Sequence, residues 1–566
     1  MTNKQIARIL KETGSLVELT GGNTFRARAF ENAGRTLERV DVSIAELAAS
    51  GELTDLKGIG DGLAAQIKEI LRRGSFDVRD DLLSQVPPGV LELLRIKGLG
   101  AKKVHLLWRG LDVTSLEELE HAARSGRLAS VEGFGAKSQQ KLIDQLELHR
   151  KYRGRRRYAE AYSFAQPVLE ALRGFDAVEA ADLAGEMRRL MDTVSAVELI
   201  ASSAGADAVE KALTAASVPV SLIREGDETV LDGTVGDDFP LRIYVAAPER
   251  YGTILWYRTG SQAHVDTFLD AYGEPKQTAD EHDVYAGAGI QYVLPELREG
   301  SGELEAAARN ELPDLIDDGD FKGTLHNHTN YSDGANTLSE MADGARALGL
   351  SYFGLCDHSR SLAIANGLSV ERVREQQAEV RRLNESYASQ QVRFRIFSGT
   401  ECDVLADGSL DYPDDVLATF DFVVASIHQG FNMSEEEGTQ RLLRAIENPY
   451  TTILGHATGR LLLAREGYPI DHERIIEACA ANEVAIEINA NPYRLDMDWR
   501  WIRRATEQGV MISINPDAHS VPDLANTHWG MLVARKAWLT PEQCLNAMPL
   551  ETFEDWLNTR RANRKP

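Results

Sequence analysis

Six of the 13 histidines fall into short motifs in the C-terminal half of the sequence, and each motif ends an apolar run that is typical of a strand. Asp333, Glu401 and Asp517 lie in or beside the same motifs. Mixtures of imidazole and carboxylate groups suit Zn²⁺, Mn²⁺ or iron, and the absence of paired cysteines argues against a structural zinc site. Burial of so many ionisable groups without partners would be costly. We therefore predict a metal centre formed by His326, His328, Asp333, His358, Glu401, His428, His456, Asp517 and His519.

The segments between these motifs predict the fold that positions them. Stretches in which apolar residues recur with helical spacing alternate with the strand-like runs. They cover residues 337–348, 369–386, 434–447, 471–482 and 497–508. A repeat of β-α units with functional residues at the strand ends is typical of a TIM-like barrel, in which the ligands converge on one rim.

The same motifs resemble the polymerase-and-histidinol-phosphatase (PHP) domain, whose pattern is His-x-His, a following acid, then His, Glu, His, His or Cys, and a closing Asp-x-His. The resemblance implies a distorted (β/α)₇ barrel over residues 320–566, three divalent metal ions and hydrolysis of phosphoesters. It also implies that Glu401 bridges two of the ions, which we expect to be Mn²⁺, Zn²⁺ or Fe²⁺, with Mn²⁺ favoured for activity. Arg460 could clamp a phosphate, because a guanidinium binds two oxygens at once, or it could form a salt bridge instead.

An internal repeat occupies the N-terminal part of the chain. Residues 56–60, 96–100 and 131–135 each consist of an apolar residue, a charged residue and Gly-x-Gly, and a stretch with helical spacing follows. The glycines allow a tight turn and expose backbone amides at the start of the next helix, where a phosphate oxygen is favoured. This is the helix-hairpin-helix pattern, which binds the DNA backbone without regard to base sequence. The predicted DNA contacts are Gly58, Gly60, Gly98, Gly100, Lys102, Lys103, Gly133, Gly135 and Lys137.

Charge is distributed unevenly along the chain. The 566 residues include 62 lysines and arginines and 87 acidic residues, a net charge of −25, which excludes a uniformly basic nucleic-acid-binding protein. Residues 1–157 nevertheless hold 27 basic and 21 acidic residues, a net charge of +6. The four cysteines form no CxxC pair, and no apolar run approaches the ~20 residues that span a bilayer. We expect a monomeric cytoplasmic protein that associates with the nucleoid and contacts no membrane.

The basic segment and the centre of the chain together resemble a bacterial family X DNA polymerase. The resemblance rests on the three hairpins and on residues 23–30, 184–189, 257–261 and 295–300, and it runs essentially end to end. It implies a helical N-terminal domain over residues 1–85, a fingers-like domain over 86–157, a palm over 158–235 and a thumb over 236–312, before the PHP domain. The expected fold class is therefore multidomain, with α-helical hairpin domains, an α+β nucleotidyltransferase-like palm and thumb, and the barrel.

The palm lacks the residues that nucleotidyl transfer requires. The family holds two cations with a Gly-Asp-x-Asp strand motif and an aspartate before Leu-Arg, and the corresponding positions here are Ala196, Glu198 and Pro240. Two of these have no side-chain oxygen, so we expect no Mg²⁺ site and no polymerisation. A nucleotide could still bind at Arg188, Arg189, Gly260 and Ser261.

Together these patterns predict a DNA-repair protein that hydrolyses phosphodiesters at DNA 3′ ends as a 3′→5′ exonuclease. Removal of 3′-phosphates and incision at abasic sites are further activities that the resemblance implies. The hairpins and the palm would hold gapped, nicked or 3′-ended DNA. Three alternatives stay open: an active gap-filling polymerase with displaced carboxylates, a small-molecule phosphoesterase, and a non-catalytic DNA scaffold.

Overall fold

The computed structural model describes residues 1–566 except residues 2, 41, 97, 132, 219, 226–227, 237 and 564–566, and the side chains of residues 4, 130, 136–137, 222–225 and 228 are also not described. The chain divides into two compact units, Met1–Arg153 and Gly154–Pro566. No helix among the described residues is long and apolar enough to cross a membrane.

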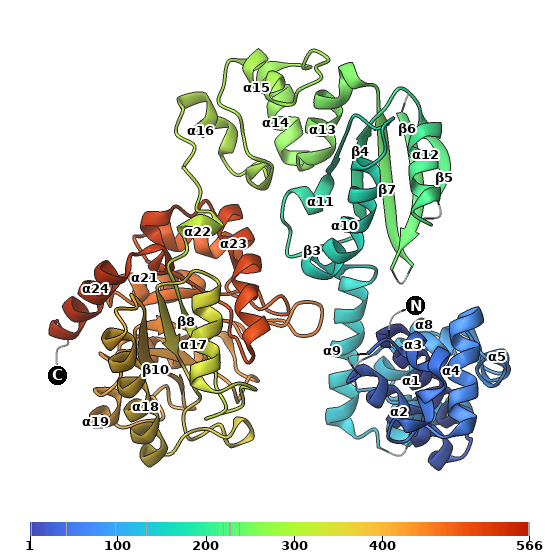
Figure 1. The fold of residues 1–566 in the computed structure, drawn as a ribbon, viewed down its shortest axis with the longest axis horizontal. Helices are drawn as coiled ribbons and strands as arrows, with labels where there is room; N and C mark the ends of the chain where they lie inside the picture. The colour runs from blue at the N-terminus through green and yellow to red at the C-terminus, as the bar shows by residue number, and fades with distance from the viewer. Residues whose placement is uncertain are drawn as a thin grey trace. The chain divides into compact units, whose positions relative to one another are not determined.

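The first unit, drawn in blue and cyan in Figure 1, is built from helices. They are α1 (Asn3–Leu19), α2 (Thr24–Glu38), α3 (Ile44–Ser50), α4 (Asp61–Arg73), α5 (Asp77–Ser84), α6 (Pro88–Leu93), α7 (Ala101–Leu111), α8 (Leu116–Arg124) and α9 (Ala136–Tyr152). Two apolar clusters form the core, one within residues 6–76 and one that joins residues 86–146 to Leu16 and Leu19 of α1. Because α1 packs into both clusters, residues 1–153 form a single compact unit that spans the expected domain boundary at residues 85 and 86.

The second unit begins with a mixed sheet. Its elements are β1 (Arg156–Arg157), α10 (Tyr158–Arg173), β2 (Ala180–Leu183), α11 (Gly185–Arg188), β3 (Thr193–Val194), β4 (Val197–Ser202), α12 (Ala206–Ala215), β5 (Val220–Glu225), β6 (Glu228–Val235) and β7 (Phe239–Ala246). Five strands pair in the order β2-β4-β7-β6-β5, and β1 pairs with β3. Buried side chains of α10 and α12 complete the core beside β4 and β7.

The palm extends further along the chain than the sequence predicts. Strand β7 lies in the centre of the sheet, parallel to β4 and antiparallel to β6. The expected boundary between palm and thumb at residues 235 and 236 is therefore wrong, because a cut there would remove a central strand. The helices that follow are α13 (Tyr251–Thr259), α14 (Gln262–Tyr272), α15 (His282–Ala288) and α16 (Glu303–Arg309).

The C-terminal part of the second unit is a barrel of seven parallel strands in the order β14-β13-β12-β11-β10-β9-β8. The strands are β8 (Gly323–Asn327), β9 (Tyr352–Leu355), β10 (Arg395–Asp403), β11 (Phe422–Ser426), β12 (Ile453–Leu454), β13 (Ala485–Asn489) and β14 (Ile512–Asn515). The helices are α17 (Leu338–Ala347), α18 (Val370–Ser389), α19 (Asp414–Leu417), α20 (Glu435–Ile446), α21 (His472–Ala481), α22 (Trp499–Glu507), α23 (Thr527–Lys536) and α24 (Leu550–Ala562). Where β8 meets the segment after β14, the His328 amide donates to the Ala518 carbonyl at 2.8 Å. The predicted barrel and its five predicted helical stretches are confirmed.

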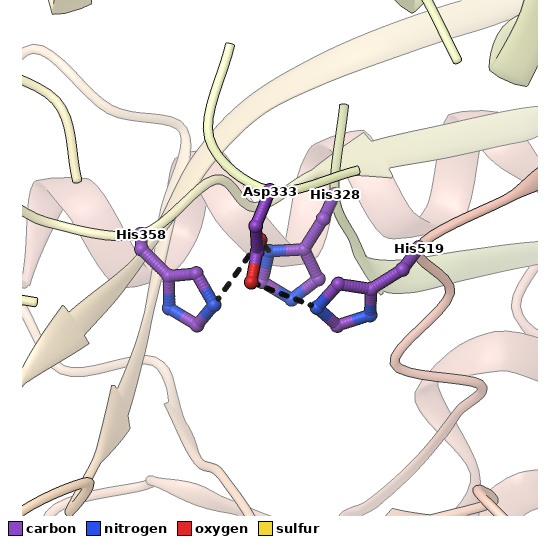
Figure 2. Close-up of side chains that lie close together, drawn as sticks. All are labelled: His328, Asp333, His358 and His519. Atoms are coloured by element: carbon purple, nitrogen blue, oxygen red, sulfur yellow. Dashed lines mark ion pairs between the residues drawn. The ribbon is translucent and has the colours of Figure 1, made fainter. Parts of the chain in front are cut away.

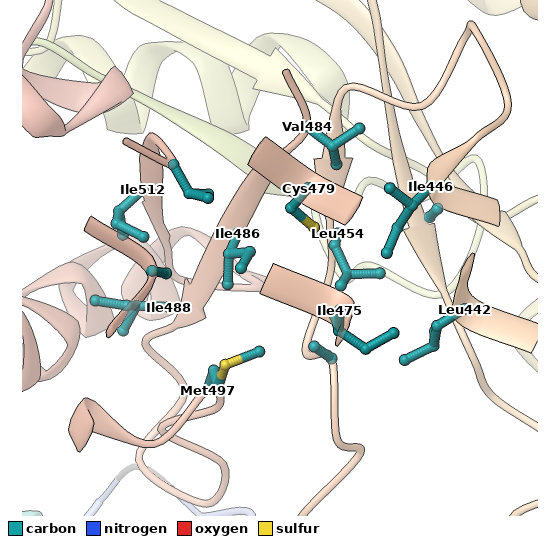
Figure 3. Close-up of a cluster of buried hydrophobic side chains, with 14 of the residues drawn as sticks. Leu442, Ile446, Leu454, Ile475, Cys479, Val484, Ile486, Ile488, Met497 and Ile512 are labelled. Atoms are coloured by element: carbon teal, nitrogen blue, oxygen red, sulfur yellow. The ribbon is translucent and has the colours of Figure 1, made fainter. Parts of the chain in front are cut away.

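Apolar side chains hold the barrel strands against the surrounding helices (Figure 3). Leu454 of β12 and Ile486 of β13 are neighbours in the sheet, and Leu442 and Ile475 from two helices belong to the same buried cluster. Strands that are covered on both faces must be apolar along their whole length. Polar residues at the buried strand ends are therefore exceptions, and each needs a hydrogen-bond partner or a bound ion.

Candidate metal centre

The predicted ligands lie at the carboxyl ends of six barrel strands. His326 belongs to β8 and Glu401 to β10, and the other seven residues lie in the segments that follow β8, β9, β11, β12 and β14. Parallel strands place their carboxyl ends on the same rim of a barrel. The fold therefore gathers residues that are nearly 200 positions apart in the sequence, as the ion pair between His328 and Asp517 illustrates.

The Glu401 carboxylate lies at the centre of this cluster and is buried. Its Oε1 is 2.9 Å from Nε2 of His456 and 3.1 Å from Nε2 of His428. Its Oε2 is 2.9 Å from Nδ1 of His358 and 3.4 Å from Nε2 of His326. A carboxylate with imidazole nitrogens near both oxygens can bind two cations, one through each oxygen.

A second carboxylate, that of Asp333, faces a further set of imidazoles (Figure 2). Its Oδ1 is 3.6 Å from Nε2 of His358 and 4.0 Å from Nδ1 of His328, and its Oδ2 is 3.5 Å from Nε2 of His519. Ligand atoms within 4.8 Å of one another form three overlapping groups: His328, Asp333, His358 and His519; His326, His328 and Glu401; and His358, Glu401 and His428. The overlap provides room for more than one cation.

The opposite charges in the cluster shift its pKa values. Burial lowers the pKa of His428, but the Glu401 and Asp403 carboxylates outweigh burial and raise it to about 10. Burial and two neighbouring imidazoles lower the pKa of His328 to about 3. Burial raises the pKa of Asp333, but the imidazoles around it lower the pKa to about 2. The ionised Asp333 carboxylate and the neutral His328 imidazole are in the protonation states that bind metals, whereas His428 must lose a proton before it binds one.

Four buried imidazole nitrogens in the cluster have no hydrogen-bond partner among the described residues. They are Nε2 of His326 and the Nδ1 atoms of His328, His358 and His456. The other nitrogen of His326, Nδ1, lies 2.7 Å from Oε1 of Glu487, which directs Nε2 towards Glu401. Because a buried polar atom without a partner is costly, a cation at this position would supply the missing interaction. The residues present therefore fit divalent metal ions.

The backbone is strained at two of the predicted ligands. His456 has φ 22° and Asp517 has φ 51°, a region that residues with a side chain rarely adopt. The His456 amide donates to Oε2 of Glu487 at 2.8 Å, and Nδ2 of Asn489 donates to Oδ2 of Asp517 at 3.0 Å. Strain of this kind costs ~1–3 kcal/mol per residue and is concentrated at functional sites.

Three polar residues that the sequence did not single out support the ligands. Asp403 accepts a hydrogen bond from Nδ1 of His428, while Glu487 and Asn489 make the contacts just described. The last two lie on β13, the one strand of the barrel that supplies no predicted ligand. Alternating polar residues in a strand that is otherwise apolar are the signal that could have identified them.

Arg460, the predicted phosphate clamp, does not face the metal cluster. Its Nη1 donates to Asp498 at 2.9 Å, its Nη2 donates to Asp192 of the palm at 2.8 Å, and its Nε donates to the Arg494 carbonyl at 3.0 Å. The Leu495 carbonyl also accepts a hydrogen bond from Nη2. Because these donors are engaged within the protein, the clamp prediction is wrong, and Arg460 forms the alternative salt bridge.

The palm residues that the structure describes form no comparable cluster. All groups of three or more potential ligands in the described part of the chain lie in the barrel. In the palm, Glu198 accepts a hydrogen bond from the Tyr244 hydroxyl at 3.1 Å and packs against Gly185, where a Cβ would lie 1.8 Å from its Oε2. Burial raises the pKa of Glu198.

The residues expected to bind a nucleotide are engaged within the protein. They are Arg188, Arg189, Gly260 and Ser261. Arg188 donates to both oxygens of Glu281, at 2.6 and 2.8 Å, and Nε of Arg189 donates to Glu299 at 3.0 Å. The Ser261 hydroxyl caps α14, which begins directly after Gly260 and Ser261. The two arginines are therefore not available to bind a triphosphate, and the structure contradicts the prediction that they bind a nucleotide.

The three Gly-x-Gly segments form similar turns. The first glycines, Gly58, Gly98 and Gly133, have φ values of 86°, 90° and 88°, which favour glycine. The second glycines, Gly60, Gly100 and Gly135, are the N-cap residues of α4, α7 and α9, and no side chain caps these helices. Lys102 is exposed, Lys103 donates to the Gly98 carbonyl at 3.2 Å, and the side chain of Lys137 lies outside the described residues. Uncapped backbone amides at three helix starts suit contacts with phosphate oxygens.

Models of known families match three parts of the chain. A helix-hairpin-helix domain matches residues 1–76, a SAM-like helix-hairpin-helix tandem matches residues 90–148, and a PHP domain matches residues 324–491. The PHP match includes all of the clustered residues except Asp517 and His519, which follow β14.

Similarity to individual proteins covers either the whole chain or a part of it. The DNA polymerase/3′-5′ exonuclease PolX of Bacillus subtilis (strain 168) is 35% identical, over 98% of this chain and 99% of that protein. A protein of Caldanaerobacter subterraneus subsp. tengcongensis named "Probable phosphatase" is 34% identical over 29% of this chain and 66% of its own length. One of the same name from Caldicellulosiruptor bescii is 28% identical over 41% of this chain and 93% of its own length.

Proposed function

The chain belongs to the bacterial family X DNA polymerases with a C-terminal PHP domain, and we propose that it is a metal-dependent phosphodiesterase that shortens DNA from its 3′ end. The observation that carries the proposal is the cluster of nine histidines and carboxylates on one rim of the barrel. The proposed ligands are His326, His328, Asp333, His358, Glu401, His428, His456, Asp517 and His519. Three divalent cations would be bound there, with Mn²⁺ favoured over Zn²⁺ and Fe²⁺ for activity.

When bound, divalent cations supply Lewis-acid chemistry to phosphoester hydrolysis, by acidifying water and by neutralising phosphate oxygens. The protein provides the orientation. Glu487 and Asp403 bind Nδ1 of His326 and His428, so that both Nε2 atoms face Glu401. Such outer contacts fix the tautomer and the direction of each imidazole.

Exposure indicates the side from which a substrate would approach. The Glu401 side chain is 1% exposed, whereas those of Asp333 and His519 are 33% and 38% exposed. We infer that the phosphodiester binds at the open side formed by Asp333 and His519, while the imidazoles around Glu401 form the floor of the site.

We further propose that the palm does not polymerise. Ala196 and Pro240 offer no ligand oxygen, Glu198 is occupied by Tyr244, and the two arginines are paired with glutamates. In this proposal, residues 154–246 are a palm-like scaffold and residues 247–312 a thumb-like one. The helix-hairpin-helix unit, with its excess of basic residues, would hold gapped, nicked or 3′-ended DNA through the phosphate backbone.

One assay tests the exonuclease and the loss of polymerisation together. Gapped DNA labelled at the 3′ or the 5′ end is incubated with Mn²⁺, with and without dNTPs, and with wild type, Glu401→Ala or Glu385→Ala. Glu385 is an exposed residue of α18 and serves as the matched control. We expect wild type and Glu385→Ala to shorten the strand from its 3′ end, and Glu401→Ala to be slower by about a thousandfold, because loss of a bridging ligand removes most of the metal-dependent rate.

The outcomes separate the alternatives. Extension with dNTPs that survives Glu401→Ala would refute the inactive palm. DNA that stays intact with wild type, under conditions in which the protein holds metal, would refute the exonuclease. The similarity to proteins named as phosphatases favours a second candidate, removal of 3′-phosphates, which is measured as phosphate released from DNA that ends in a 3′-phosphate.

A further inference from the structure

The segment between β13 and α22 borders the metal centre. It begins after Asn489, whose side chain donates to Asp517, and the Tyr493 carbonyl in its middle accepts a hydrogen bond from the Leu462 amide at 2.7 Å. Leu462 itself lies in the segment that follows the clustered His456. The segment is therefore fixed at the same rim as the metal centre and is held there from two sides.

Arg494 lies in this segment, and its guanidinium has only one long ion pair within the described residues. Its Nε is 3.7 Å from Oδ2 of Asp517, and its side chain is 21% exposed. Among the described residues, no atom accepts a hydrogen bond from the Arg494 guanidinium. By contrast, the nearby Arg460 donates to two aspartates, and Arg465 donates twice to the Gly459 carbonyl. Arg494 is thus the arginine of this rim whose donors are available to a ligand.

Tyr493, the preceding residue, presents an exposed aromatic ring. The residue is 55% exposed, although it is large and apolar. The Arg157 guanidinium lies 3.8 Å from the centre of the ring and covers part of it. An exposed aromatic ring next to an available guanidinium, beside a metal-binding cluster, is the combination that binds a nucleotide through its base and its phosphate.

We propose that Tyr493 and Arg494 form the subsite for the 3′-terminal nucleotide, in which Arg494 binds oxygens of the phosphate that is cleaved and the Tyr493 ring stacks on the terminal base. The proposal rests on the exonuclease function and adds the residues that select a nucleotide end. A guanidinium can offer two parallel N–H donors to two phosphate oxygens, which suits Arg494 to this role. Stacking on an aromatic ring tolerates every base, so this subsite recognises a nucleotide without reading its identity.

The experiment compares two oligonucleotides that differ only at the 3′-terminal residue, which carries its base in one and lacks it in the other. Wild type, Tyr493→Ala, Tyr493→Phe, Arg494→Gln and Arg494→Lys are assayed for kcat and KM with Mn²⁺, and their metal content is measured. Arg382→Ala, at an exposed position of α18, is the control for removal of a positive charge.

We expect wild type to have about a tenfold lower KM for the end that carries a base, and Tyr493→Ala to lose this preference while Tyr493→Phe keeps it. Arg494→Gln is expected to lower kcat/KM about a hundredfold for both oligonucleotides at unchanged metal content, with partial rescue in Arg494→Lys. A Tyr493→Ala variant that still prefers the base, or an Arg494→Gln variant that keeps its activity or loses metal, would overturn the subsite. If wild type is active and every variant has the same kcat and KM, the subsite proposal alone is refuted. If wild type cleaves neither oligonucleotide, the proposed exonuclease function is refuted, and the subsite proposal with it.

Discussion

A single carboxylate, that of Glu487, contacts two of the clustered histidines, His326 through its ring and His456 through its backbone amide. Its Oε1 accepts from Nδ1 of His326 at 2.7 Å and from Nδ2 of Asn515 at 2.9 Å, and its Oε2 accepts from the backbone amide of His456 at 2.8 Å. Each oxygen of a carboxylate can accept more than one hydrogen bond, so this one side chain holds three groups in place. Glu487 therefore acts on the metal centre without belonging to the predicted ligands.

We expect Glu487→Gln to weaken metal binding about 10- to 100-fold while the fold is kept. The side-chain NH₂ group of glutamine would face one of the N–H groups that now donate to Glu487, and two donors cannot form a hydrogen bond. The measurement is a titration of the metal-free protein with Mn²⁺. Glu477→Gln, at an exposed position of α21, is the control. Equal affinity in wild type and both variants would show that Glu487 does not orient the histidines.

The sequence could predict the ligands but not their supports, for a physical reason. A histidine at the end of an apolar run stands out by its type, and His326, His358 and His428 were identifiable in this way. The role of Glu487 depends on a hydrogen bond to a residue 161 positions away, which no local pattern records. Arg460 was misread for the same reason, because its partner Asp192 is 268 positions away in the palm.

At the scale of elements, a buried ion-pair network ties the start of the palm to the helices that follow it. Glu281, directly before α15, is 4% exposed and binds Arg188 of α11 through both oxygens. It also accepts hydrogen bonds from Arg298 at 2.5 Å and from the Tyr292 hydroxyl at 2.7 Å. The network joins Arg188 to a segment that begins 93 residues later in the chain.

Acid should weaken this network. Burial raises the pKa of Glu281, but Arg298 and Arg188 outweigh burial and lower the pKa from 4.5 to about 2. A carboxyl group whose pKa is lower in the folded state stabilises the protein above its unfolded pKa and loses that contribution as the pH falls. The difference corresponds to about 3 kcal/mol, present above about pH 5 and lost between about pH 4.5 and pH 2.

We therefore expect Glu281→Gln to lower the free energy of unfolding of the second unit by about 3 kcal/mol at neutral pH, and by progressively less towards pH 2. Urea unfolding at a series of pH values measures the difference. Glu274→Gln, at an exposed position nearby, should follow wild type throughout. A difference that is the same at neutral pH and at about pH 2 would mean that the network does not depend on the ionised carboxylate.

The presence of helices and strands was easier to predict from the sequence than the boundaries between domains. The strand and helix alternation of the barrel follows from the spacing of apolar residues, so five of its helices were found within a few positions. The end of the palm was not, because β7 is identified as a palm strand only by its pairing with β6 and with β4, whose partner residues lie 44 positions earlier in the chain. Pairing between distant strands is a property of the sheet rather than of either strand.

At the scale of the whole molecule, the palm, the thumb and the barrel are joined into one unit by contacts of several kinds. Trp529 of α23 lies edge-on to Tyr158 of α10, with ring centres 6.2 Å apart. Arg460 of the barrel binds Asp192 of the palm. Lys536, at the end of α23, is buried. The sheet of residues 156–246 is thus a structural neighbour of the barrel.

Lys536 is the contact whose removal should reveal this coupling. Its ammonium group donates to Oε1 of Glu299 at 2.5 Å, to the Arg189 carbonyl at 2.9 Å and to the Glu296 carbonyl at 3.4 Å. Removing one partner of a buried ion pair costs about 3–5 kcal/mol, because the other charge stays buried. Arg189 also binds Glu299 and would compensate in part, so we expect about 3 kcal/mol for Lys536→Met.

The coupling predicts how metal removal affects parts that bind no metal. A ligand that binds only the folded state stabilises every element that unfolds together with its site. In wild type, removal of metal with a chelator should therefore lower the melting temperature of palm and barrel together, as measured by calorimetry of the full chain. In Lys536→Met the palm should melt at a lower temperature that no longer depends on metal, while the barrel still responds. Lys276→Met, at an exposed lysine of the same unit, should behave like wild type. If the melting temperature of the palm in wild type does not change when metal is removed, the two parts unfold independently.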